Sequence, residues 1–303
     1  LLSRRQRQMC IRDSSYIPET ENKMINTHIE EQILRQEYRR CLEYVKDSHF
    51  HTLYANEKIE HSFQVIGAGN YIMKHEKYYQ GRDETFLRLA KLAYLFHDIG
   101  RFREICELFD LGIEHLSATK LDHGAFGAEF LSRLPQYDTP FLLLPVKYHN
   151  KLIEDYYNSA EYYNLEKEKK DITEILKLVR DADKIANFHL ITTRTEELKE
   201  LFCPENARNL PQNIQPEILE DFMNEKAIDL RKIKTVCDRI LNLLSWTYDL
   251  NYLPSFVFCS KLNCFDKMLN ILKTCNPDNK TQEKVEKKLK SFITKQYKAL
   301  SSN

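Results

Sequence analysis

Six histidine and aspartate side chains are spaced along the chain as the ligands of a metal site could be. They are His61, His97, Asp98, His123, His149 and Asp183. Apart from the adjacent pair, each falls on or at the end of a different expected helix, and helical bundles build metal sites from one or two inward side chains per helix. Imidazole and carboxylate ligands without thiolate suit Mn, Fe, Zn, Ni or Co and leave coordination positions for water.

The adjacent pair lies in "YLFHDIGRF", residues 94–102, where a run of large apolar side chains stops. The preceding residues are apolar on most faces, so we expect a central buried helix over 83–98, with Gly100 as its left-handed C-terminal cap. Burying His97 and Asp98 among apolar walls is costly unless they bind something. We therefore interpret the pair as ligands that end the helix.

The other ligands need helices of their own to position them. Apolar periodicity predicts helices over 30–45, 57–75, 117–134 and 172–188, and a short apolar helix or turn over 140–150. Small residues in 117–134 allow a neighbour to approach closely, namely Gly124, Gly127 and Ala128.

Composition predicts an all-α protein, because only 7 Gly and 9 Pro occur among 303 residues rich in helix formers. We expect residues 26–195 to form a metal-binding catalytic core. Residues 196–303 are expected to be a C-terminal helical extension or lid, with helices over 229–250 and 281–300 after a polar, proline-punctuated segment at 203–217.

Residues 1–25 show no core-forming pattern, so we expect a non-native or disordered tail. Residues 9–14 match the translation of a sequencing-adapter end. Our hypothesis is that the region around 4–14 is an adapter-derived artefact and that the native protein starts at Met24.

Charge and cysteine usage limit the classes of partner. Lys and Arg total 45, as do Asp and Glu, so no overall field attracts nucleic-acid polymers or acidic membrane surfaces. The eight cysteines form no CxxC pair, which favours reduced thiols in a cytoplasm. The apolar run at 141–146 is too short to span a bilayer. We expect a cytoplasmic protein without a membrane partner.

Five motifs carry a resemblance to a known family: "EHSFQV", "FHDIGRF", "KLDHGAFGAEFL", "KYHNK" and "VRDADKIANF". Their order, H…HD…H…H…D, resembles the HD-domain superfamily of metal-dependent phosphohydrolases, and more closely a group of bacterial HD-domain proteins. The resemblance extends weakly into "LLSWTYDLNY" and covers about residues 40–255. It implies an HD-domain helical bundle that uses divalent transition metal ions.

Carried over residue by residue, the resemblance implies two ions. The first ion would be held by His61, His97, Asp98 and Asp183. Asp98 would bridge to a second ion bound by His123 and His149. Such a pair clamps a phosphoryl group and activates a water that attacks phosphorus. The cations expected to neutralise phosphate are Arg101 and Lys184, with Lys120 and Arg180 as weaker candidates.

One position departs from the family pattern, and another ligand position has two candidate residues. Gln64 stands where the family pattern H-x-x-R-V has arginine, so one supporting charge is missing while every ligand is present. Asp181 competes with Asp183 for the last ligand position. We prefer Asp183 because "ADK" matches the family motif, and we expect Asp181 to orient a histidine.

The resemblance favours a hydrolase acting on a small phosphate ester or nucleotide. A di-iron oxygenase stays open, because some family members hold di-iron centres with similar ligands. A non-catalytic nucleotide-sensing module, with the C-terminal helices as its output, is the third possibility. The sequence leaves the substrate, the metal and the oligomeric state open. We expect side chains of the C-terminal helices and of a loop at 102–116 to determine which ester binds.

Overall fold

The computed structural model describes residues 26–114, 121–193, 213–226, 228, 232–275 and 278–301. The expected N-terminal tail, Lys120 and most of the polar segment at 203–217 lie outside these residues. Within them the chain forms helices joined by turns and contains no strand. The predicted all-α class is confirmed.

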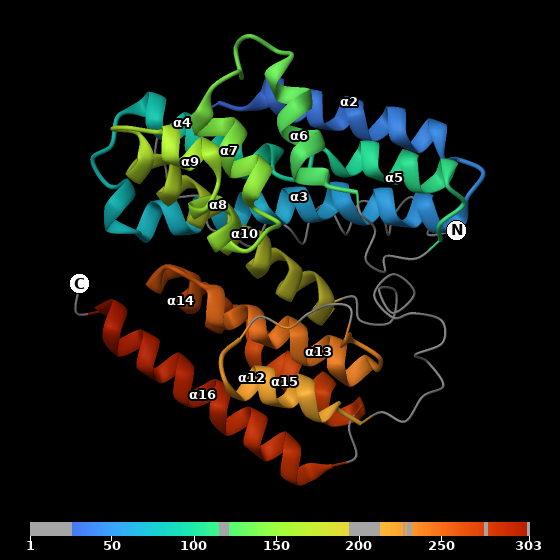
Figure 1. Ribbon diagram of the computed structural model, residues 1–303, viewed down its shortest axis with the longest axis vertical. Helices are drawn as coiled ribbons and strands as arrows, with labels where there is room; N and C mark the ends of the chain where they lie inside the picture. The colour runs from blue at the N-terminus through green and yellow to red at the C-terminus, as the bar shows by residue number, and fades with distance from the viewer. Residues whose placement is uncertain are drawn as a thin grey trace.

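Figure 1 shows two groups of helices with one long helix, α10, running between them. The first group contains α2 (His28–Tyr44), α3 (His49–His75), η1 (Lys77–Tyr79), α4 (Glu84–Phe96), α5 (Arg101–Asp110), α6 (His123–Ser132), α7 (Pro140–Tyr148), α8 (Ile153–Tyr157) and α9 (Ala160–Asn164). Helix α10 (Lys169–Thr193) packs against α3, α4 and α7 of this group and against α14 and α15 of the second.

The second group is the C-terminal extension, and we use that name for its described residues between 213 and 301. It contains α12 (Pro216–Met223), α13 (Val236–Ser245), η4 (Trp246–Asp249), α14 (Leu253–Lys261), α15 (Cys264–Cys275) and α16 (Asn279–Ser301). One apolar core runs through both groups, because buried side chains of α3, α4 and α10 are continuous with those of α13 to α16. The predicted lid role of this extension stays a prediction.

Polar caps fix where several site-bearing helices begin. The carboxylate of Asp83 accepts a hydrogen bond from the backbone N–H of Phe86, 2.9 Å away, at the start of α4. Asp122 accepts from the N–H of Ala125, 3.0 Å away, at the start of α6. These caps satisfy N–H groups that lack partners within the helix. The cap at Asp122 places His123 in the first turn of α6.

The expected helices over 30–45, 57–75, 83–98, 140–150 and 172–188 correspond to α2, α3, α4, α7 and α10. The helix expected over 117–134 begins only at His123, and residues 117–120 of it lie outside the described part. The expectation over 229–250 is met in part, by α13 and η4 from Val236 to Asp249, while residues 233–235 are not helical and 229–231 lie outside the described part. Helix α16 meets the expectation over 281–300. Helices α5, α8, α9, α12, α14 and α15 were not predicted.

Two expectations about the α4–α5 corner were wrong. Gly100 is not a left-handed cap, since its φ is −70°. A Cβ there would lie 2.0 Å from the carbonyl oxygen of His123 and 2.4 Å from the backbone nitrogen of Gly127, so glycine is required by close packing. The expected loop at 102–116 is largely helix α5, whose inner side buries Phe102, Ile105 and Leu108.

Candidate metal centre

Four helices and one corner bring the six predicted ligands together. His61 lies within α3, His97 and Asp98 at the α4–α5 corner, His123 at the start of α6, His149 at the end of α7, and Asp183 within α10. The four histidines and Asp98 are at most 4% exposed. Residues up to 122 positions apart in the chain therefore meet in one buried site.

The first ligand group is formed by His61, His97, Asp98 and Asp183. The Nε2 atoms of His61 and His97 are 3.3 Å apart. Nε2 of His61 lies 2.9 Å from Oδ1 of Asp183, and Nε2 of His97 lies 3.7 Å from the same oxygen. Oδ2 of Asp98 lies 3.8 Å and 3.7 Å from the two Nε2 atoms. Both Nε2 atoms thus face an oxygen of each aspartate.

The second ligand group is formed by Asp98, His123 and His149. The Nε2 atoms of the two histidines are 3.2 Å apart. They lie 3.3 Å and 3.4 Å from Oδ1 of Asp98. Asp98 therefore presents Oδ2 to one pair of histidines and Oδ1 to the other, as a bridging carboxylate must.

Backbone carbonyls fix the tautomers of two of the histidines. Nδ1–H of His97 donates to the carbonyl oxygen of Tyr94, 2.8 Å away. Nδ1–H of His149 donates to that of Val146, 2.7 Å away. In a neutral ring the other nitrogen, Nε2, then carries the lone pair that a metal requires. Both lone pairs point into the site.

The donor set fits divalent metal ions. Two nitrogens about 2.0–2.1 Å from a tetrahedral metal are separated by roughly 3.3 Å, and the Nε2 pairs here are 3.3 Å and 3.2 Å apart. Facing lone pairs on neighbouring imidazoles repel each other unless a proton or a cation lies between them. Two groups of donor atoms, one made by His61, His97 and Asp98 and one by Asp98, His123 and His149, could each hold an ion.

Comparison with known proteins identifies one family for the segment that carries these residues. Residues 59–187 match the family model described as HD domain, and this segment contains all six candidate ligands. Residues 59–187 form an HD domain. Comparisons with the curated proteins and with the solved structures found no match. HD domains bind divalent metals and are typical of metal-dependent hydrolases, in agreement with the clusters found here.

The electrostatics of the HD domain suit metal binding at neutral pH. Burial lowers the pKa of His97 to about 4 and lowers that of His123 well below its ordinary value, so both rings are neutral. Burial raises the pKa of Asp98, but the positive charges of Arg101 and Lys58 and a hydrogen bond from His149 oppose it, and that pKa lies well below the ordinary range. Neutral imidazoles and ionised carboxylates are the forms that bind metal.

Two cations flank the bridging carboxylate. Nε of Arg101 lies 3.4 Å from Oδ1 of Asp98, and Nζ of Lys58 lies 3.8 Å from Oδ2. Arg101 also donates from one terminal nitrogen to Oε2 of Glu104, 2.7 Å away, and to the hydroxyl oxygen of Tyr54, 3.1 Å away. Sequence reasoning found Arg101 and missed Lys58. Its position one helical turn before His61 was the available signal.

The ammonium group of Lys58 can donate hydrogen bonds to a further partner. Its side chain is 8% exposed, and its contacts to carboxylates are 3.4 Å to Glu57 and 3.8 Å to Asp98, both longer than an ordinary charged hydrogen bond. Neither oxygen of Glu57 has a hydrogen-bond partner among the described residues, although Glu57 is fully buried. This side of the centre is polar, buried and incompletely paired.

The remaining predicted residues have other neighbours. Lys184 lies 2.9 Å from Oδ2 of Asp249, so its charge is already compensated, and its role toward phosphate stays a prediction. Arg180 pairs with the same carboxylate. The expectation that Asp181 orients a histidine is not met, because Asp181 accepts hydrogen bonds from Asn251, Tyr252 and Ser255 instead. Asp183 is therefore the aspartate at the centre.

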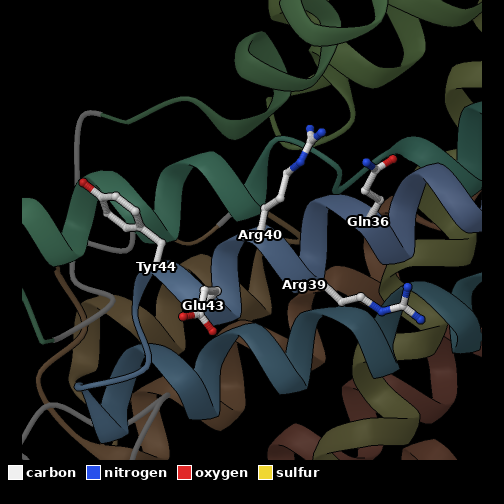
Figure 2. Close-up of a pocket in the computed structure, with 5 residues that line it drawn as sticks. All are labelled: Gln36, Arg39, Arg40, Glu43 and Tyr44. Carbon is white, nitrogen blue, oxygen red and sulfur yellow. The ribbon is translucent and has the colours of Figure 1, made fainter.

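A separate surface depression on α2 does not belong to this centre. Figure 2 shows its lining residues, among which the side chains of Arg39 and Arg40 point in different directions. Arg40 is paired with Glu37, and the hydroxyl of Tyr44 donates to Asp110. None of the candidate ligands lines the depression. Among the described residues, no helix combines the length and apolar character needed to cross a membrane.

Proposed function

We propose that this protein is a metal-dependent phosphohydrolase that cleaves a small phosphate ester or nucleotide with two divalent transition metal ions. The observation that supports it most is the position of Asp98, whose two oxygens face two separate histidine pairs and are flanked by Lys58 and Arg101. When bound, a pair of divalent ions supplies a nucleophilic water at neutral pH and a positive clamp for phosphoryl oxygens.

The chain's own residues have distinct roles in this proposal. His97 and His149 present Nε2 lone pairs because their Nδ1–H groups are tied to backbone carbonyls. Asp98 stays ionised and joins the two halves of the centre. Arg101 and Lys58 neutralise charge on the phosphoryl group, the first with a planar fork of donors and the second with a point charge. We further propose that the partner is a small phosphorylated molecule rather than a nucleic-acid polymer or a membrane, and that the protein acts in the cytoplasm.

The test is phosphate release from a panel of monoesters, diesters and nucleotides by manganese-loaded protein. We expect turnover that is lost in Asp98→Ala and retained in Asp138→Ala, which removes an exposed aspartate. Absence of turnover across the panel contradicts the proposal. Oxygen consumption by iron-loaded protein would then support an oxygenase, and nucleotide binding without turnover would support a sensing module.

A further inference from the structure

The match to the HD domain ends at residue 187, yet the C-terminal extension reaches back to the metal centre. Asp249, at the end of η4, places Oδ2 2.5 Å from a terminal nitrogen of Arg180 and 2.9 Å from Nζ of Lys184. Both cations belong to α10, and they lie on either side of the ligand Asp183 in the sequence. One carboxylate of the extension thus compensates two buried cations beside the site.

Arg180 connects this carboxylate to a ligand of the second group. Its other terminal nitrogen donates to the backbone carbonyl of His149, 3.0 Å away, and to that of Lys151. Arg180 is 5% exposed. The guanidinium therefore bridges Asp249 on one side and the chain segment around His149 on the other.

The segment around His149 needs such a support. His149 is the C-terminal cap of α7, and carbonyls at the end of a helix lack donors within the helix. The carbonyls of His149 and Lys151 find their donor in Arg180. His61, in contrast, lies within the long helix α3, whose own backbone hydrogen bonds hold it on both sides.

The position of Asp249 is itself fixed by α10. The carboxylate of Asp181 accepts hydrogen bonds from the backbone N–H groups of Asn251 and Tyr252, 2.9 Å and 3.2 Å away, and from the hydroxyl of Ser255. These residues lie two to six positions after Asp249. Without Asp249, Arg180 and Lys184 would be two buried like charges one helical turn apart, which favours withdrawal of Arg180 from His149.

We infer that Asp249 and Arg180 are positioning residues, and that the C-terminal extension completes the second half of the metal centre by holding the backbone of His149. The inference rests on the proposed two-ion centre and not on any particular substrate. Outer partners of metal ligands typically change metal affinity by about 10–100-fold when removed.

The test is calorimetric titration of metal-free full-length protein with Co²⁺ alone. In the native protein we expect two binding events. In Asp249→Asn one event weakens by about 10–100-fold while the other stays within about threefold. Arg180→Lys keeps the charge but cannot reach both carbonyls and Asp249 at once, so it should reproduce this selective loss.

Three further variants show which ligand group is affected. In His149→Ala, we expect loss of the binding event that belongs to Asp98, His123 and His149. In the double variant that also carries Asp249→Asn, the affinity of the remaining binding event should not change further. Lys261→Met removes a different contact between the extension and the first group, the hydrogen bond from Nζ to the hydroxyl oxygen of Tyr71, 3.0 Å away, and should leave both events intact.

Far-ultraviolet circular dichroism checks that each variant is folded. If Asp249→Asn does not fold, the metal titration of Arg180→Lys tests the inference in its place. Native affinities for both ions in a folded variant overturn the inference, as does equal weakening of both events. Failure of the native protein to bind two ions contradicts the proposed centre as well, so the two failures can be told apart.

Discussion

At the scale of single residues, the proposed chemistry depends on the sharing of Asp98 between the two candidate ligand groups. Oδ1 and Oδ2 face different histidine pairs, and a cation lies beside each oxygen. Cations next to a site that collects metal ions are unfavourable unless anions balance them. Glu57 and Glu104 supply part of this balance. An anionic ligand such as phosphate would supply the rest.

Replacing Lys58 tests this arrangement. We expect Lys58→Met to weaken the binding of inorganic phosphate to metal-loaded protein about tenfold, since a hydrogen bond to a charged group contributes about 1.5–3 kcal/mol. Metal content, measured by elemental analysis, should stay at the native value. The measurement is calorimetric titration with phosphate.

The matched control is Lys91→Met, which removes a buried lysine of α4 near Glu31 and Arg88. It should bind phosphate like the native protein. Unchanged phosphate affinity in Lys58→Met would show that Lys58 is only a counter-ion of Glu57 and Asp98.

Most of the candidate centre could be predicted at this scale, because the motifs carrying the histidines are local in sequence. The choice between Asp181 and Asp183 could be made from the family motif and is supported by the 2.9 Å contact of Asp183 with His61. The actual partners of Asp181 are Asn251, Tyr252 and Ser255, which lie about 70 positions away. No spacing rule connects such distant segments, so its role could not be predicted.

At the scale of elements, the α4–α5 corner determines how closely the two ligand groups approach. Gly100 packs against the backbone of α6 at His123 and Gly127, and Gly124 packs against the backbone of α7 at Lys147. These contacts bring the helices carrying Asp98, His123 and His149 together. The small side chains at Gly124 and Gly127 predict this close approach. The sequence around Gly100 suggests a helix cap instead, and for that reason α5 was not predicted.

Gly100→Ala tests the role of this corner. The added Cβ would lie 2.0 Å from a backbone oxygen that cannot move independently of α6. We expect a loss of about 1–3 kcal/mol or more in the free energy of unfolding, together with weaker binding of the second metal ion. Urea unfolding and metal titration measure the two effects.

For comparison, Ser132→Ala changes an exposed residue at the end of α6 and should alter stability by no more than about 0.5 kcal/mol. If Gly100→Ala is as stable as that control and binds two ions normally, the close packing at the corner does not position the ligands.

At the scale of the whole molecule, the two groups of helices in Figure 1 share α10, which carries both Asp183 and the polar links to the C-terminal extension. The all-α class and the segments that carry the candidate metal centre could be predicted from composition and motifs. The packing of the extension could not, because it depends on contacts such as Asp249 with Arg180, which have no sequence pattern.

The buried histidines also give the whole molecule a defined pH dependence. His97, His123 and His51 have pKa values lowered by burial, to about 4 for His97, whereas an unfolded chain binds these protons near pH 6.5. Between these pH values the unfolded state binds more protons than the folded state. The stability that these neutral histidines contribute is therefore fully present above about pH 6.5 and is lost as the pH falls toward 4.

We therefore expect metal-free protein to unfold at a lower urea concentration at pH 5 than at pH 7.5. The contribution of His51, His97 and His123 should be the same at pH 7.5 and 8.5, since both values lie above the pKa of an unfolded histidine. An equal or higher midpoint at pH 5 would mean that these histidines are charged or exposed in the folded protein.

The central claim, two metal ions sharing Asp98, is tested most directly by anomalous diffraction from crystals of manganese-loaded protein at the manganese absorption edge. We expect two anomalous peaks, one among His61, His97, Asp98 and Asp183 and one among Asp98, His123 and His149. A single peak, or peaks away from Asp98, would contradict it.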